Sequence, residues 1–271
     1  MISPSGTQYE IVHGAHRACA VEVGGGLRTY VAAGRDVIYG YDKHEMCSGA
    51  RGQVLAPWPN RIQGGSYTFE GRDLQLPLTE ASSGNAIHGL VRYVSWHAVA
   101  HESDRVSFEL VLHPQPGYPF TLLLRNEYRV SGRGLEVTTS AENVGATAAP
   151  FGLGHHPYLS PPSGSVDDMV FELPGREPRH VGAARLDDTF GDLDRDAEGI
   201  ARVRVDKATV WMDASYRYVL VFTGDIPGVD RRGLAVEPMT CPRNAFRTGE
   251  GLIQLDPGDR FEARWGIDPG L

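Results

Sequence analysis

Cysteine is scarce in this chain, and long apolar runs are missing. The 271 residues contain three cysteines, Cys19, Cys47 and Cys241, and no Cys-x-x-Cys pair. Such a set is too small for a disulfide framework and lacks the spacing of zinc ligands, so we expect buried free thiols in a reducing compartment. No apolar run approaches the roughly 18 residues of a membrane span, and the first 16 residues show no signal-peptide pattern. We therefore predict a cytoplasmic protein that does not act in a membrane.

Positive charge is in deficit. Lys and Arg number 26 against 34 Asp and Glu, which gives a formal net charge of −8 at pH 7. A net negative chain is a poor candidate for binding nucleic acid or an anionic membrane surface. Hydrophobic residues make up 41% and charged residues 22%, as in a globular protein and unlike a disordered one.

Motifs for several common chemistries are absent as well. The chain has no P-loop, no Gly-x-Ser-x-Gly nucleophile elbow and no His-Glu-x-x-His zinc motif. Gly24-Gly25-Gly26 lacks the spacing and the following helix of a dinucleotide site, and is better interpreted as a turn between strands. His155 and His156 are adjacent, so on a strand they point to opposite faces and would not bind one metal together. We predict neither a metal nor a cofactor.

Helix signals are nearly absent, and turn residues are abundant. Glycine and proline together make up 51 of 271 residues, or about 19%, whereas the average protein has roughly 12%. The best helical candidate is a short turn within 178–186. No linker or repeat divides the chain, and the Pro- and Ser-rich segment 161–165 is too short to mark a boundary. We predict one domain over residues 1–271.

Short alternating segments dominate the pattern. Val106, Phe108, Leu110 and Leu112 share one face of 105–112, and 135–141 alternates in the same way. Period-two alternation is typical of half-buried strands. A hairpin is expected over 67–76, turning near Glu70-Gly71. Many short strands separated by turns predict an all-β, antiparallel sandwich or barrel. Further strand candidates are 17–23, 27–33, 92–100, 121–130, 201–205, 208–212, 218–223, 233–237 and 260–267.

Five polar clusters remain as candidates for chemistry, and one of them contains His156. If 151–158 is extended, Phe151, Leu153 and His155 share one face, while His156 stands on the other face above two glycines, where a ligand could approach. Pro157 favours this extended form of the preceding residue. His156 is equally well explained as a hydrogen-bonded core histidine, and His155 is better explained as structural. The clusters are 56–62, 85–90, 151–159, 186–190 and 234–240.

Glu237 stands in an apolar strand, opposite in parity to Leu234 and Val236. Partial burial would raise the pKa of its carboxyl toward the range useful to a base; an exposed strand-end carboxylate is the simpler interpretation of the segment alone. Asn60-Arg61 follows a rigid Pro-Trp-Pro loop, so Arg61 could bind hydroxyl or carboxylate oxygens, or lie free on the surface. His88 is similarly ambiguous, and Trp96 is expected in the core.

These clusters, in this order, resemble the aldose 1-epimerase (galactose mutarotase-like) family, in a bacterial subgroup. The resemblance runs from Asn60-Arg61 through Asn85-Ala-Ile-His-Gly-Leu and His156-Pro-Tyr-Leu to Glu237-Pro-Met-Thr-Cys-Pro and Leu255-Asp-Pro-Gly-Asp. It implies a large antiparallel β-sandwich with a concave face for a sugar. It also implies interconversion of the α and β anomers of a free aldose, without metal or cofactor.

The resemblance further implies roles for individual residues. Glu237 would be the general base and His156 the general acid, while Asn60, Arg61, His88 and an aspartate of 186–190 would bind the sugar. Asp187 is the preferred aspartate because the family places it before an aromatic residue, here Phe190, and Asp188 is the alternative.

Two other functions fit the same fold. A hexose-6-phosphate mutarotase would need an arginine cluster at the sugar's C6 end, and a sugar-binding or sensing domain would need no acid/base pair. A structural or adhesive sandwich suits a secreted protein better. The phosphate alternative has these candidate arginines: Arg51, Arg61, Arg231, Arg232 and Arg243.

Overall fold

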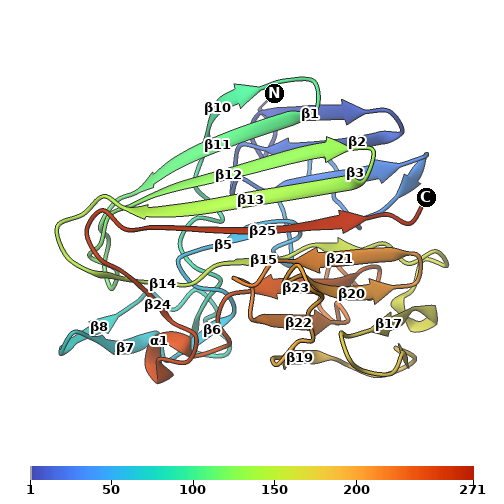
Figure 1. The fold of residues 1–271 in the computed structure, drawn as a ribbon. Coiled ribbons are helices and arrows are strands. Elements are labelled where there is room, and N and C mark those ends of the chain that lie inside the picture. The colour runs from blue at the N-terminus through green and yellow to red at the C-terminus, as the bar shows by residue number, and fades with distance from the viewer. Residues whose placement is uncertain (1) are drawn as a thin grey trace.

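The computed structural model describes residues 2–271, which form antiparallel β-sheets with very little helix (Figure 1). The largest sheet has nine strands, and all its neighbouring strands are antiparallel. Its order is β10 (His97–His101), β11 (Arg105–Leu112), β12 (Leu122–Ser131), β13 (Gly134–Asn143), β25 (Arg260–Asp268), β21 (Ala208–Met212), β20 (Ala201–Val205), β17 (Val170–Glu172) and β18 (Arg179–His180).

A six-stranded sheet lies below the long strands β11–β13 and β25 in the view of Figure 1. It follows the order β19 (Asp187–Phe190), β22 (Tyr218–Phe222), β23 (Leu234–Met239), β15 (Gly154–His155) and β5 (Val54–Leu55), with β16 (Tyr158–Leu159) also paired to β23. β23 is buried along its whole length.

Smaller sheets complete the molecule. A four-stranded sheet contains β1 (Gln8–His13), β2 (His16–Val21), β3 (Leu27–Ala32) and β4 (Arg35–Asp36). Three strand pairs are β6 (Arg61–Gln63) with β9 (Asn85–Ile87), β7 (Ser66–Phe69) with β8 (Arg72–Gln75), and β14 (Ala149–Phe151) with β24 (Ile253–Leu255). The helical residues described are a 3₁₀ turn, Val166–Asp168, and α1, Ala245–Thr248.

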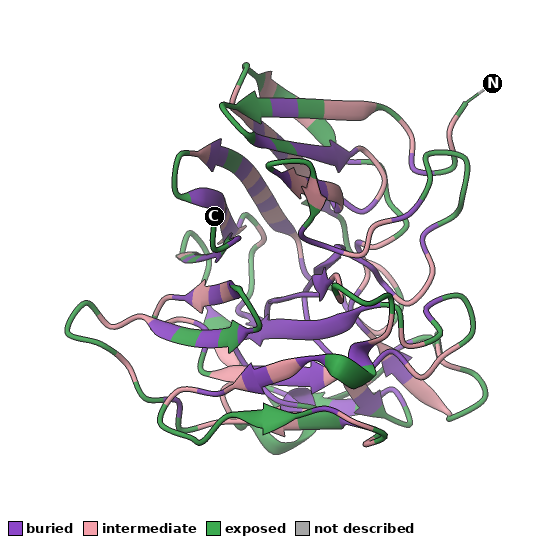
Figure 2. Cartoon of the chain, turned by 90° about the vertical axis from the view of Figure 1, so that its right-hand side faces the viewer, coloured by how far each residue is buried: buried purple, intermediate pink, exposed green. Residues whose placement is uncertain are grey.

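Burial follows the period of the strands. Along β12, every second residue is buried and the alternate ones are partly or fully exposed, so the strand carries alternating bands in Figure 2. The buried positions join one large apolar cluster that includes Trp58, Trp96 and Trp265. The predicted all-β antiparallel fold is confirmed, and Trp96 is in the core as expected. The three cysteines are free and buried.

Two local predictions are wrong. Within 178–186 no helix forms: residues 179–180 pair with β17 as strand β18, and the turn that follows, closed by the Ala184 N–H and the Val181 carbonyl, does not continue into a helix. The strand expected at 92–100 begins only at His97. The residues before it form a loop, because the Trp96 backbone N–H donates to the Glu22 carbonyl and the Arg92 carbonyl accepts from the Gln53 side chain. The hairpin turning at Glu70-Gly71 is confirmed. No helix in the described residues is long and apolar enough to cross a membrane.

Candidate active site

The register of the six-stranded sheet brings His156 and Glu237 together. β15 and β16 both pair with β23, with Gly154 opposite Met239 and Tyr158 opposite Ala235. In both pairs the residue numbers add to 393, so the same register places His156 opposite Glu237. Directly opposed side chains share a face and lie within reach of each other. The His156 Nε2 atom is 3.1 Å from Glu237 Oε1.

The same face carries an aspartate from the edge of this sheet. Asp187 on β19 is opposite Phe222 on β22, and Phe222 is opposite Ala235 on β23. Because Ala235 and Glu237 are two residues apart on one strand, Asp187 lies on the face of Glu237. Asp188 has the opposite parity. Of the two aspartates left open by the sequence, Asp187 is the one that lines the pocket.

Burial dominates the electrostatics of the His156–Glu237 pair. The two side chains are 5% and 2% exposed. Burial raises the pKa of the Glu237 carboxyl well above its ordinary value, and Asp187 adds to that shift while Arg61 opposes it. Burial also lowers the pKa of His156 to about 3. Both shifts favour the uncharged forms, so we expect a protonated carboxyl beside a neutral imidazole.

Two polar atoms of the pair have no hydrogen-bond partner. Within the described part of the chain, Glu237 Oε2 and His156 Nδ1 are buried and have no hydrogen-bond partner. The imidazole of His156 stacks on the Tyr158 ring, with centroids 4.8 Å apart and an interplanar angle of 12°. Unpartnered buried polar atoms are unusual and often mark a binding or catalytic function.

His88 enters the pocket from the strand pair β6–β9. Arg61 is opposite Ile87 in that pair, so the next residue, His88, is close to Arg61. The chain turns sharply there: Gly89 has φ +69°, and a Cβ on it would lie 1.9 Å from the Ala56 carbonyl oxygen. Only glycine fits this close approach, and the turn directs His88 toward His156, with ring centroids 5.3 Å apart.

Asn60 fixes the tautomer of His88. The Asn60 backbone N–H donates to His88 Nδ1 at 3.1 Å, and the Asn60 backbone carbonyl accepts from the His88 backbone N–H at 2.8 Å. Because Nδ1 accepts a hydrogen bond, the ring proton is on Nε2. Burial lowers the pKa of His88 well below its ordinary value, and His156, Arg92 and Arg61 add to the shift. His88 is therefore a neutral hydrogen-bond donor.

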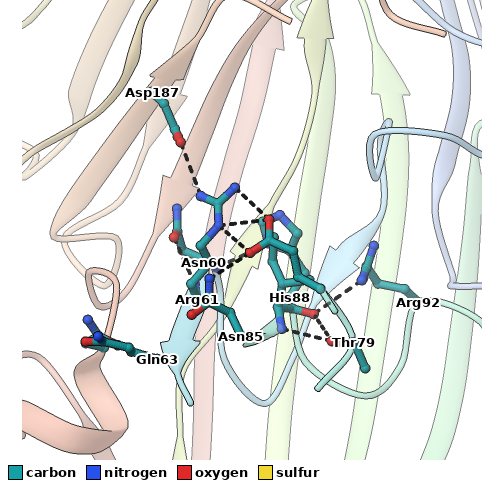
Figure 3. Close-up of polar contacts among 11 residues, drawn as sticks. Asn60, Arg61, Gln63, Thr79, Asn85, His88, Arg92 and Asp187 are labelled. Atoms are coloured by element: carbon teal, nitrogen blue, oxygen red, sulfur yellow. Dashed lines mark hydrogen bonds and ion pairs between the residues drawn. The ribbon is translucent and has the colours of Figure 1, made fainter. Parts of the chain in front are cut away.

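Arg61 is held by two carboxylates (Figure 3). Its Nε atom is 2.9 Å from Glu80 Oε2, and its Nη1 atom donates to Asp187 Oδ2 at 3.2 Å. Glu80 also accepts from the Asn85 side chain at 2.8 Å. The guanidinium therefore has a fixed position, and Asp187 reaches it from a strand more than a hundred residues away in the sequence.

These side chains surround one cavity of about 260 Å³. All six residues that the sequence nominated line it, although they come from five separate segments. Sequence reasoning missed Glu80 and Arg92, which are in loops with no local motif, and it named Tyr158 only as part of the motif His156-Pro-Tyr-Leu. No group of three or more His, Cys, Asp or Glu side chains in residues 2–271 is arranged to hold a metal ion. The nominated residues are Asn60, Arg61, His88, His156, Asp187 and Glu237.

Other expectations about this region have mixed outcomes. His155 is buried on the opposite face, where its Nε2 atom is 3.0 Å from the Thr139 hydroxyl, in keeping with a structural role. The expectation that a ligand could approach His156 over Gly152 and Gly154 is wrong. A Cβ on Gly154 would lie 2.7 Å from Pro59 Cβ, and one on Gly152 would lie 2.5 Å from Cys241 Sγ. These glycines allow close packing of the chain itself.

Of the five arginines nominated for a phosphate site, Arg61 lines the pocket and the other four do not. Arg243 is close enough to Glu80 to lower the pKa of that carboxyl, whereas Arg51 donates to the Gly40 carbonyl and to Ser48. Arg231 pairs with Asp167 and Asp225, and Arg232 pairs with Asp230.

Comparison with known proteins places the chain in a family. The family model described as aldose 1-epimerase matches residues 7–267. The uncharacterized protein YihR of Escherichia coli K12 is 33% identical over 280 residues, covering 94% of this chain and 90% of its own. A second uncharacterized protein of that organism, YphB, is 28% identical over 157 residues, covering 57% of this chain and 53% of its own.

Solved structures share the fold at low sequence identity. A putative aldose 1-epimerase from E. coli K12 has a TM-score of 0.79 at 20% identity, covering 97% of this chain and 98% of its own. A galactose mutarotase-like protein from Clostridium acetobutylicum has a TM-score of 0.80 at 16% identity, covering 95% and 93%. The fold is thus the galactose mutarotase-like β-sandwich. Because the family model matches residues 7–267, nearly the whole of this chain, the chain belongs to the aldose 1-epimerase family.

Proposed function

We propose that this protein is a mutarotase that interconverts the α and β anomers of an aldose by general acid/base catalysis. The observation that carries the proposal is the buried contact between Glu237 Oε1 and His156 Nε2, 3.1 Å apart in a cavity large enough for a small ligand. A carboxyl and an imidazole with strongly shifted pKa values in one pocket are the usual sign of an acid/base pair.

The reaction moves only protons at the two oxygens bonded to C1. Glu237, as a carboxylate, takes the proton of the O1 hydroxyl, and His156, as an imidazolium, gives a proton to the ring oxygen O5. The C1–O5 bond breaks as the C1–O1 double bond forms, which gives the open-chain aldehyde. Rotation about C1–C2 and closure on the other carbonyl face produce the second anomer, with the roles of the two residues reversed. No step needs a metal or a redox cofactor.

The proton count of the His156–Glu237 pair suits this chemistry. A protonated Glu237 beside a neutral His156 holds as many protons as a carboxylate beside an imidazolium, so one transfer between the two converts the resting pair into the reactive pair. Since the two groups are in contact, we expect them to titrate as a unit.

The remaining pocket residues would bind and orient the sugar. The Nε2–H of His88 would donate to a ring or hydroxyl oxygen, and the remaining N–H groups of Arg61 would donate to hydroxyls. Asp187, with its side chain 43% exposed, would accept from a sugar hydroxyl. Asn60 would act indirectly, by holding the tautomer of His88.

Polarimetry of freshly dissolved α-D-glucose and α-D-galactose tests the proposal, with the wild type, Glu237→Gln and His156→Ala. We expect the wild type to accelerate the approach to the equilibrium rotation, and both variants to lose most of this effect. Each positioned acid or base typically contributes about 10²–10⁴-fold. His155→Gln is the matched control, because His155 is the adjacent buried histidine but faces the core. Full activity in Glu237→Gln would reject the base, and binding without acceleration would indicate a sugar-binding domain.

A further inference from the structure

Arg92 is a second cation in the pocket, and it lacks the carboxylate partners that Arg61 has. In residues 2–271, no Asp or Glu is within ion-pair distance of its guanidinium, and its Nη2 atom donates to the Ile87 carbonyl at 3.2 Å. The Nε atom is buried and has no partner in the described chain. The side chain lies over the Tyr93 ring, 5.1 Å from the centroid. The guanidinium is therefore held by the Ile87 carbonyl and by Tyr93, but by no carboxylate.

The charges of the pocket are divided between two ends. At one end Arg61 is accompanied by two carboxylates, those of Glu80 and Asp187. In the view of Figure 3, Arg92 lies on the other side of His88 from Arg61. The histidines of the pocket are neutral, so Arg92 leaves its end of the pocket positive.

A partly buried cation without a counter-ion is costly, because burial removes hydration that no carboxylate replaces. The same burial lowers the pKa of Arg92. A bound neutral sugar would supply dipoles to this guanidinium but no charge. A bound anion would supply both, and the Nη groups of a guanidinium fit the paired oxygens of an oxyanion.

We infer that the preferred substrate is an acidic aldose, whose anionic substituent binds to Arg92, which has no carboxylate partner, at the end of the pocket opposite Asp187. The inference rests on the proposed mutarotase function and adds the class of sugar. The chemistry shared by the possible substituents is an oxyanion, either the planar carboxylate of a uronic acid or a tetrahedral phosphate or sulfate ester. Arg92 was not among the arginines that the sequence nominated for such a site.

The test compares one neutral and three acidic sugars at equal ionic strength: glucose, glucuronic acid, glucose 6-phosphate and glucose 6-sulfate. Anomer exchange at equilibrium, followed by NMR, gives kcat and KM for each. We expect kcat/KM for at least one acidic sugar to exceed that for glucose by about tenfold to 100-fold, as charge-assisted hydrogen bonds allow. The acidic sugar with the highest kcat/KM identifies the oxyanion.

Variants assign the preference to Arg92. Arg92→Gln should lower the ratio of acidic to neutral kcat/KM by about tenfold to 100-fold, mainly through KM, because the substituent keeps its charge during the reaction. Arg92→Lys keeps the charge but loses the paired, planar N–H donors of the guanidinium, so it should give an intermediate ratio. Arg133→Gln is the matched control: Arg133 is exposed in the turn between β12 and β13 and should leave the ratio unchanged.

Two failures are distinguishable. If glucose is interconverted as well as every acidic sugar, or if Arg92→Gln leaves the ratio unchanged, the inference about Arg92 is overturned and the mutarotase proposal stands. If no sugar is interconverted by the folded wild type, the mutarotase proposal fails. Calorimetric titration with the same acidic sugars then decides the role of Arg92: binding that Arg92→Gln weakens supports it, and no binding rejects it.

Discussion

Replacement of Glu237 by Gln should separate activity from stability. The change keeps the size of a side chain that is 2% exposed, so we expect no cavity and no loss of packing. It removes the proposed base, which predicts a fall in kcat of about 10²–10⁴-fold. A buried structural residue of the same size would behave differently, because its loss would appear in the free energy of unfolding.

The stability effect has a sign that depends on pH. The raised pKa of Glu237 means that the folded protein binds this proton more tightly than the unfolded chain. As pH rises from the unfolded pKa of about 4.5 toward the folded one, the carboxyl therefore lowers the free energy of unfolding, by about 1.4 kcal/mol per pH unit. Gln carries no such proton. The variant should gain stability relative to the wild type as pH rises.

Thermal unfolding of both proteins between pH 5 and pH 8, together with anomer exchange by NMR, measures the two effects. For a chain of this size, each 1 kcal/mol shifts Tm by about 2–4 °C. The reasoning is refuted if Gln keeps activity within tenfold of the wild type. It is also refuted if the Tm difference, variant minus wild type, shrinks as pH rises, since that would mean the folded state favours the ionised carboxyl.

Three further predictions follow from the pocket and its surroundings. His155→Gln should lower the free energy of unfolding by about 1–3 kcal/mol, because the contact with Thr139 is lost, while kcat stays within a few-fold; urea unfolding and anomer exchange check this. Burial lowers the pKa values of His88, His155 and His156, the last two to about 3, so stability should fall as pH drops from about 6.5 toward 3. Each imidazole contributes about 1.4 kcal/mol per pH unit, and urea unfolding at pH 6.5, 5.5 and 4.5 should show uptake of more than one proton. Arg61→Gln should raise KM by about tenfold to 100-fold through lost hydroxyl binding, and an unchanged KM would remove Arg61 from the sugar site.

The long strands could be predicted from sequence because their signal is local. β11 begins and ends at the residues that the alternation of 105–112 indicated, and the hairpin turns where Glu70-Gly71 predicted. Local signals failed where distant partners decide the backbone. Residues 92–96 alternate like a strand, but their backbone groups bond to Gln53 and Glu22, and no window of sequence contains those partners.

The pocket also contains residues whose role depends on distant partners and not on a local sequence signal. Glu80 could not be found, since it lies in the loop between β8 and β9 and its partner Arg61 is 19 residues away. Arg92 could not be found either, because what distinguishes it is the missing carboxylate partner. The family resemblance nominated the residues with motifs, but it says nothing of the loop residues beside them.

His156 and Glu237 show what a single segment cannot decide. Each had an ordinary structural explanation, and the sheet register is what makes them a pair. Leu234 and Val236 join the large apolar cluster, whereas Ala235 packs with Tyr158 on the face that carries Glu237. A slip of one residue between β23 and its neighbours would exchange these faces, burying the carboxylate in the core and sending Val236 into the pocket. Because Gly154–Met239 and Tyr158–Ala235 fix the register on both sides of His156, the position of the proposed base depends on the burial of its apolar neighbours as much as on its own chemistry.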